Sequence, residues 1–198
     1  MRIVDDPHGW RRGSWLIRAA GDADRPPLLD LADMSEGAFL RPAGRPGLSE
    51  ITERLLVGEF PRPDDAEWLR SERGVEAVVC LQDQADLEAK QIVWQDLVRA
   101  YERAGIELHH FPVADGDTAA LGVKLIEIVD CVHTLLASGK RVLVHCNGGY
   151  NRAPTVAIAY LHRHRGLSLA ESRRRVRERR TCAPYMRALE SALGGSCR

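Results

Sequence analysis

A cysteine lies between a short apolar run and a polar segment that contains two adjacent glycines. The apolar run is VLVH (142–145), the cysteine is Cys146, and an arginine, Arg152, follows six residues later. A cysteine thiolate is a strong nucleophile, and the planar guanidinium of an arginine can hold two oxygens of one phosphate group. These residue types at this spacing therefore indicate nucleophilic attack on a phosphate ester.

The residues between the cysteine and the arginine have the composition of an anion-binding loop. If a helix begins just after them, successive backbone N–H groups of the loop can turn inward, and the helix dipole strengthens their positive field. Gly148 and Gly149 permit the close backbone approach and the positive φ angles that such a loop needs. The field favours the thiolate form of Cys146. The residues expected to bind phosphate are Asn147, Gly148, Gly149, Tyr150, Asn151 and Arg152.

The second requirement of this chemistry is a proton for the leaving oxygen. Attack by Cys146 would form a cysteinyl-phosphate that water then hydrolyses, and a general acid must reach the same site from another loop. The segment HFPVADGDT offers Asp115 directly after an extended stretch, with Asp117 as the second candidate. The structural alternatives are a buried cysteine at a strand end and an ordinary Asp-Gly turn.

Strand-like and helix-like stretches alternate from about residue 49 onward. Short apolar runs predict strands, and apolar residues at helical spacing predict helices. Such alternation implies an α/β fold with a central, mostly parallel sheet flanked by helices. We expect residues 49–198 to form one catalytic domain and residues 1–48 to be an N-terminal extension of unknown role. The expected strands are 54–58, 75–81, 106–113 and 141–145, and the expected helices are 63–72, 86–105, 118–140, 153–165 and 168–180.

The sequence HCNGGYNRA around Cys146, with PVAD upstream, resembles the signature of the cysteine-dependent dual-specificity phosphatases. That signature is His-Cys, two residues, Gly, two residues and Arg, and the resemblance spans about residues 49–192. It implies a protein-tyrosine-phosphatase-like fold and a phosphomonoesterase that needs no cofactor. It also implies that Cys146 is the nucleophile, that Arg152 binds phosphate, and that Asp115, 31 residues before the cysteine, is the general acid.

A narrower resemblance is to the plant starch-excess, or laforin-like, glucan phosphatases. The segments VVCLQDQADLE and RRTCAPYMRALESA, and the Ala-Pro pair after Arg152, are similar to their catalytic domain. This resemblance implies a phosphorylated α-glucan as substrate, with a phosphoprotein or a phospholipid head group of the phosphoinositide type as alternatives. The chain departs from these relatives at Tyr150 and Asn151, and we expect no second, carbohydrate-binding module. The aromatic residues expected at the mouth of the site are Phe111, Tyr150 and Tyr185.

Three further residues have expected supporting roles. His145 is expected to hydrogen-bond the backbone around Cys146 and so to support the thiolate. Ala153 replaces the Ser or Thr that the wider family usually has there to stabilise the departing thiolate, so we expect slow hydrolysis of the phosphoenzyme. Cys80 ends a predicted strand. It is a candidate redox partner that would protect oxidised Cys146 by forming a disulfide, and the alternative is a small core residue.

Charge is distributed unevenly along the chain, although the formal net charge is zero. Up to residue 140 there are 16 Lys and Arg against 25 Asp and Glu, and from residue 141 onward there are 12 against 3. The basic C-terminal part would attract an anionic substrate. The alternative is that ESRRRVRERR (171–180) is only the solvated face of a helix.

Composition argues against several other classes of protein. Five cysteines without paired spacing favour free thiols in a reducing compartment. No apolar run has the length of a membrane span or a secretory signal, so we expect a cytoplasmic protein. We expect no metal site, because the histidines lack ligand spacing, and no nucleic-acid partner. Two other functions stay open: a phospho-ligand binding module that has lost catalysis, and a rhodanese-like sulfur carrier.

Overall fold

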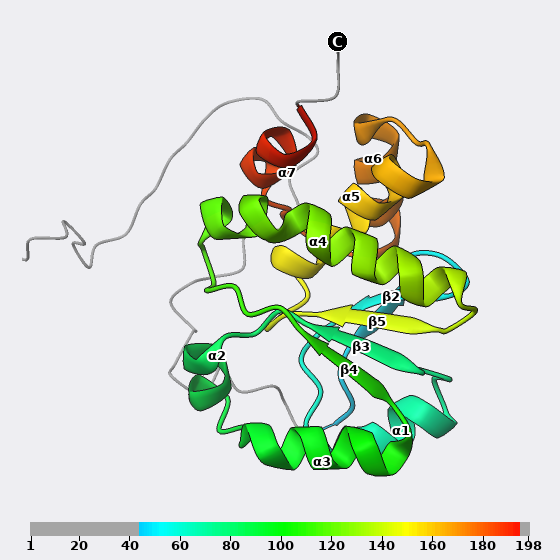
Figure 1. Ribbon diagram of the computed structural model, residues 1–198, viewed down its shortest axis with the longest axis vertical. Coiled ribbons are helices and arrows are strands. Elements are labelled where there is room, and N and C mark those ends of the chain that lie inside the picture. Colours follow the sequence, from blue (N-terminus) through cyan, green and yellow to red (C-terminus); the bar gives the residue numbers. More distant parts are fainter. Residues whose placement is uncertain (1–43, 195–198) are drawn as a thin grey trace, which may run out of the picture. The chain divides into compact units, whose positions relative to one another are not determined.

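A five-stranded sheet forms the centre of the part of the chain that the computed structural model describes, residues 44–194. Most of the expected N-terminal extension, residues 1–43, lies outside the described residues. The strand order is β1-β2-β5-β3-β4 (Figure 1). β1 pairs antiparallel with β2, and the other three pairs are parallel. The strands are Leu48–Glu50 (β1), Leu55–Gly58 (β2), Ala77–Cys80 (β3), Glu107–His110 (β4) and Val142–His145 (β5).

The three central strands, β2, β5 and β3, are buried on both faces of the sheet. Val79 of β3 and Val144 of β5 belong to the hydrophobic core on one face, and Val78 and Leu143 belong to the core on the other. Continuous burial of this kind is typical of parallel strands that are covered by helices on both sides. The predicted α/β fold with a mostly parallel sheet is confirmed.

Helices cover both faces of the sheet. α4 and α5 pack against one face, with α6 and α7 outside them, and α1 and α3 lie against the other face (Figure 1). No helix within residues 44–194 is long and apolar enough to cross a lipid bilayer. The helices are Ala66–Ser71 (α1, after a 3₁₀ turn at Pro63–Asp65), Gln84–Ala89 (α2), Trp94–Ala104 (α3), Thr118–Ala137 (α4), Arg152–Arg165 (α5), Leu169–Arg179 (α6) and Met186–Leu193 (α7).

The prediction of one continuous helix over residues 86–105 is wrong. The chain forms α2, turns, and then begins α3. Gln91 has a φ of 55°, a left-handed conformation that interrupts a right-handed helix. The turn is closed by the Ile92 N–H, which donates to Leu87 O at 2.9 Å. Helical spacing cannot reveal such a break, because both segments place apolar residues on the side facing the core.

Two short elements, β1 and α7, were not predicted from the sequence. β1 has three residues and α7 has eight. Elements this short are unstable in isolation and depend on tertiary contacts. β1 is held by pairing with β2, and α7 by packing on α4.

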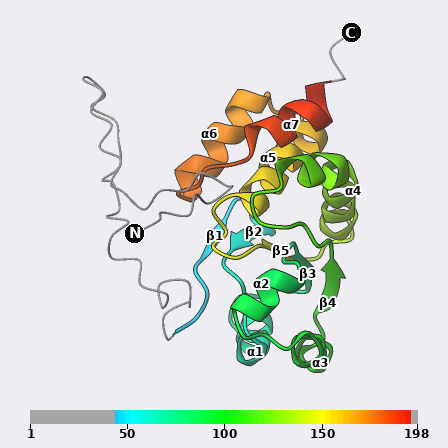
Figure 2. The same cartoon turned by 90° about the vertical axis from the view of Figure 1, so that its left-hand side faces the viewer.

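The carboxyl ends of β3 and β5 lie side by side. Cys80 is opposite His145 in the parallel register, and the N–H of Leu81 donates to His145 O at 3.0 Å. Cys146 therefore leaves β5 next to the end of β3. Helix α2 and the loop between β5 and α5 lie on the side of the domain that faces the viewer in Figure 2. In open α/β sheets this edge is where ligands bind.

Candidate active site

The loop between β5 and α5 requires glycine at one of its two glycine positions. Gly149 has a φ of 60°, and a Cβ atom there would lie 2.5 Å from the carbonyl oxygen of Gly58. Both the backbone angle and the space therefore demand glycine. Gly148 has no positive φ, and the nearest atom to a Cβ there would be Tyr150 Cβ at 3.9 Å. The expectation of a positive φ and a close approach is wrong for Gly148.

The carbonyl groups of this loop point outward. Those of residues 147–150 each accept a hydrogen bond from outside the loop. The first and last accept the backbone N–H groups of Phe60 and Ala183, both at 2.9 Å, and the two between them accept from the side chain of Arg180. In a trans peptide the C=O and the following N–H point in opposite directions, and the described residues contain no cis peptide. The N–H groups of residues 148–151 therefore face the inner side of the loop, the geometry of an anion-binding nest.

Arg152 begins α5, and its side chain is only 1% exposed. Its Nη1 donates to Asp86 Oδ2 and to Val113 O, both at 2.6 Å. Burial lowers the pKa of Arg152, but the hydrogen bond to Asp86 and nearby negative charges outweigh this, so the pKa is raised. Its Nε and Nη2 are buried without a hydrogen-bond partner among the described residues. Buried donors are nearly always satisfied, and within residues 44–194 Nη2 has no partner while Nε faces only the exposed carboxylate of Asp115, at 3.3 Å. These two nitrogens of one guanidinium match two oxygens of a phosphate.

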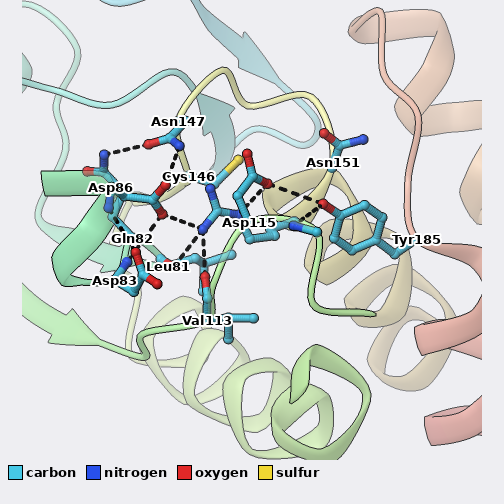
Figure 3. Close-up of polar contacts among 12 residues, drawn as sticks. Leu81, Gln82, Asp83, Asp86, Val113, Asp115, Cys146, Asn147, Asn151 and Tyr185 are labelled. Atoms are coloured by element: carbon cyan, nitrogen blue, oxygen red, sulfur yellow. Dashed lines mark hydrogen bonds and ion pairs between the residues drawn. The ribbon is translucent and has the colours of Figure 1, made fainter. Parts of the chain in front are cut away.

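Asp86 on α2 is a residue of the site that the sequence analysis missed. Its carboxylate accepts hydrogen bonds from Arg152 and, at 2.5 Å, from Asn147 Nδ2. Gln82 Nε2 in turn donates to Asn147 Oδ1 at 2.8 Å (Figure 3). The start of α2 thus fixes both ends of the loop. The available signal was an acidic residue shortly after the buried strand β3, because neighbouring parallel strands end at the same edge of the sheet.

Asp115 lies at the same site, with its Oδ1 3.3 Å from Arg152 Nε. Its side chain is 51% exposed, so it forms part of the open side of the site. The hydroxyl of Tyr185 donates to Asp115 Oδ1 at 3.2 Å and accepts the N–H of Gly116 at 2.9 Å (Figure 3). Asp117, the second candidate, instead caps α4 by accepting a backbone N–H of the first turn at 2.8 Å. The structure brings Asp115, and not Asp117, to Arg152.

Cys146 follows β5 and is 2% exposed. The Nδ1 of the neighbouring His145 lies 3.3 Å from Cys146 O, so the expected hydrogen bond to the backbone is present. Burial lowers the pKa of His145 to about 4, and the ring is neutral near pH 7. Any support that His145 provides for the thiolate therefore comes from holding the backbone and not from a positive charge.

The pKa of His145 predicts that acid weakens the fold. The pKa is about 6.5 in an unfolded chain and about 4 in the folded protein, so the stability contributed by the neutral ring is present above pH 6.5 and is lost as the pH falls toward 4. Between pH 7 and pH 4 we expect wild type to lose roughly 3 kcal/mol more unfolding free energy than His145→Gln. Denaturant titrations across this range measure the difference. Parallel pH profiles for the two proteins would contradict the prediction.

The remaining predicted residues lie in the loop, in the first turn of α5 and at the end of β3. Ala153 is fully buried in the first turn of α5, and Tyr150 is 48% exposed. Asn151 Nδ2 donates to Ala183 O at 2.7 Å and so ties the loop to the segment before α7. Cys80 is a free, fully buried thiol, and burial raises its pKa to about 12.

A sequence profile of the dual specificity phosphatase catalytic domain matches residues 70–190 of the chain. The chain belongs to this family. The matched region contains the loop between β5 and α5 with Cys146 and Arg152, as well as Asp86 and Asp115. The family resemblance of the motif around Cys146 is thereby confirmed.

Curated relatives of this dual-specificity phosphatase domain include two plant proteins. Phosphoglucan phosphatase DSP4 of Castanea sativa is 32% identical over 146 residues, which are 72% of this chain and 38% of the relative. Phosphoglucan phosphatase LSF1 of Arabidopsis thaliana is 30% identical over 114 residues, 58% of this chain and 19% of the relative. The chain therefore spans less than half the length of either protein. The narrower resemblance to glucan phosphatases is also confirmed at the level of sequence.

Solved structures of tyrosine and dual-specificity phosphatases have the same fold. The crystal structure of Tk-PTP in its active form is 30% identical, with a TM-score of 0.63, and the match covers 73% of this chain and 95% of Tk-PTP. PTPMT1 is 21% identical, with a TM-score of 0.62 over 74% of this chain and 91% of that protein, and supports the fold alone. The predicted protein-tyrosine-phosphatase-like fold is confirmed.

Proposed function

We propose that the chain is a cysteine-dependent phosphomonoesterase of the dual-specificity type, with Cys146 as nucleophile, Arg152 as phosphate ligand and Asp115 as general acid. The observation that carries the proposal is the buried guanidinium of Arg152, next to a loop whose N–H groups face inward. Its Nη2 has no partner among the described residues, and its Nε faces only the exposed carboxylate of Asp115, at 3.3 Å. This arrangement offers donors to a tetrahedral oxyanion and places a cysteine at the start of the same loop. A structural cysteine at a strand end would explain neither the unpartnered Nη2 nor the orientation of the N–H groups.

The chemistry then runs in two displacements at phosphorus. Cys146 Sγ attacks, an S–P bond forms, the P–O bond to the leaving group breaks, and protonated Asp115 gives its proton to the departing oxygen. Water next attacks phosphorus, the S–P bond breaks, and the Asp115 carboxylate accepts a proton from the water. The loop N–H groups and Arg152 stabilise the charge on the phosphoryl oxygens in both steps. None of these steps calls for a metal or a cofactor.

Hydrolysis of p-nitrophenyl phosphate in the presence of a chelator tests the proposed activity. We expect turnover by the wild-type chain and release of one phosphate per phenolate. A wild-type protein that binds inorganic phosphate but does not hydrolyse the ester would be a phospho-ligand binding module. Transfer of sulfur from thiosulfate to cyanide would instead identify a rhodanese-like carrier.

We propose phosphorylated α-glucan as the substrate. The proposal is supported by the two phosphoglucan phosphatases among the relatives. Phosphate release from phosphorylated glucan, phosphopeptides and phosphoinositides should be compared at equal enzyme concentration. A glucan rate below the other two would overturn the choice of substrate and leave the proposed chemistry intact.

Replacing the general acid should make the rate depend on the leaving group. Asp115→Asn cannot supply a proton, so we expect kcat for an alkyl phosphate to fall by roughly 100- to 10,000-fold. The loss should be much smaller for an aryl phosphate whose phenolate leaves without a proton. Asp117→Asn is the matched control, since asparagine also caps helices well. Equal losses on both esters for Asp115→Asn would contradict its role.

Introducing a hydroxyl at residue 153, directly after Arg152, should speed hydrolysis of the phosphoenzyme. A hydrogen bond to the departing thiolate is worth about 1.5 to 3 kcal/mol, so Ala153→Ser should raise kcat roughly tenfold or more. The control is Ala157→Ser, the same change one turn further along α5, where residue 157 is also fully buried. An unchanged or lower kcat for Ala153→Ser would contradict slow breakdown of the phosphoenzyme.

Three further expectations stay predictions. Cys80 lies at the end of β3, the strand next to the one that Cys146 follows, as a resolving thiol requires. Burial raises its pKa, so the thiol is a poor nucleophile as long as it stays buried. A cytoplasmic location and a catalytic domain that extends over residues 49–198 are the other two.

A further inference from the structure

The basic run at the end of α6 contains two kinds of arginine. Those on the helix are exposed and form a solvated face, as one of the two interpretations of the sequence proposed. Arg180 differs, because it is the first residue after α6, has extended backbone angles (φ −148°, ψ 129°) and is partly buried. The exposed arginines are Arg173, Arg174, Arg175, Arg177 and Arg179.

The guanidinium of Arg180 binds the outer side of the phosphate loop. Nη2 donates to Gly148 O at 2.8 Å, and Nε donates to Gly149 O at 2.5 Å. Nη1 of the same guanidinium hydrogen-bonds strands β1 and β2 and the residue just before β1. Its acceptors are Gly47 O at 3.2 Å, Ser49 Oγ at 3.2 Å and Val57 O at 3.4 Å.

These two loop contacts determine the direction of two N–H groups. Each carbonyl that Arg180 holds outward belongs to a planar trans peptide, so the N–H of the next residue must point inward. Holding Gly148 O therefore aims the N–H of Gly149, and holding Gly149 O aims the N–H of Tyr150. The fit is close, since a Cβ atom at residue 149 would lie 2.5 Å from Arg180 Nη2. The planar guanidinium of Arg180 thus fixes the orientation of two consecutive peptide groups.

Arg180 forms no ion pair within residues 44–194, so no neighbouring carboxylate neutralises its charge. All five of its hydrogen-bond acceptors are uncharged, and no described carboxylate lies within 4 Å of it. Glu59 acts on it only from a greater distance. Burial lowers the pKa of Arg180, but a guanidinium stays protonated at neutral pH. Its positive charge therefore adds to the field that the inner side of the loop presents to an anion.

We propose that Arg180 is a positioning residue for the phosphate loop, which acts through the carbonyls of Gly148 and Gly149 to aim two N–H groups at bound phosphate. It does not touch the substrate. The inference deepens the proposed phosphatase function and rests on it for the kinetic effects, whereas the effect on phosphate binding does not require hydrolysis.

The test compares wild type, Arg180→Ala and Arg180→Lys, with Arg179→Ala as the matched control on the exposed face. Calorimetric titration gives the dissociation constant of inorganic phosphate from the protein, and p-nitrophenyl phosphate hydrolysis gives kcat and KM. Circular dichroism defines the temperature range in which each variant is folded, and all measurements are made within it. Lysine keeps the charge but cannot hold two carbonyls with a planar fork.

We expect Arg180→Ala to weaken phosphate binding and to lower kcat, each by roughly 100-fold, because misplaced N–H groups lose contacts with both the bound phosphate and the transition state. Arg180→Lys should recover part of the phosphate affinity and little of kcat. Arg179→Ala should stay within about twofold of wild type in both. If Arg180→Ala does not fold, Arg180→Lys decides alone.

Two results would overturn different claims. A folded Arg180→Lys with wild-type kcat and phosphate affinity would refute the positioning role, while wild-type hydrolysis would keep the proposed function. A wild-type chain that binds phosphate but does not hydrolyse the ester would refute the proposed function. In that case a loss of phosphate affinity in the Arg180 variants would still support the positioning role.

Discussion

Replacing Cys146 by serine should lower kcat for p-nitrophenyl phosphate by roughly four to six orders of magnitude. The hydroxyl of serine is a far weaker nucleophile than a thiolate at neutral pH. The serine side chain has the same shape and is only slightly smaller, so the loop and its N–H groups should keep their geometry. The measurement is steady-state hydrolysis, with calorimetric binding of inorganic phosphate as the second readout.

The second readout separates loss of the nucleophile from loss of the site. Cys146→Ser should bind inorganic phosphate about as tightly as wild type, because the donors of the loop and of Arg152 are unchanged. Cys182→Ser is the matched control, since Cys182 is also buried but follows α6. Hydrolysis by Cys146→Ser within tenfold of wild type would refute the covalent mechanism.

Removing the carboxylate of Asp86 should weaken both the fold and the catalysis. Asp86→Ala leaves the guanidinium of Arg152 without its buried ion-pair partner, with only the exposed Asp115 nearby, and we expect a cost of about 3 to 5 kcal/mol of unfolding free energy. It also releases Asn147, which accepts from Gln82 and donates to Asp86. Because Arg152 and the loop then lose their fixed positions, kcat/KM should fall by roughly 100-fold or more.

Denaturant unfolding and aryl phosphate kinetics measure the two effects of Asp86. Asp86→Asn removes the charge and keeps one acceptor oxygen, while the other oxygen, which accepts from Arg152 or Asn147, becomes an NH2 donor. Its losses should lie between those of wild type and Asp86→Ala. Glu88→Ala, on the exposed side of the same helix, should change the unfolding free energy by less than about 0.5 kcal/mol. If Asp86→Ala matched Glu88→Ala in both measurements, Asp86 would have no structural role at the site.

The parallel sheet could be predicted because its strands carry a local signal. Runs such as AVVC and VLVH are buried on both faces, and buried parallel strands contain continuous apolar residues whatever covers them. The interruption at Gln91 and the short elements β1 and α7 had no such signal. The two short elements depend on contacts with residues far away in the sequence, as in the pairing of β1 with β2.

The sequence by itself determined the proposal for the reacting groups, because a cysteine, a glycine and an arginine at this spacing, after an apolar strand, indicate their chemistry within the seven residues 146–152. Only the tertiary structure shows where the carboxylates lie. The sequence offered Asp115 first and Asp117 second, and the structure places Asp115 beside Arg152 while Asp117 caps α4. Asp86 and Arg180 also contact the loop from 61 and 31 residues away. Contacts over such separations follow from the register of the strands and the packing of the helices, which no local pattern records.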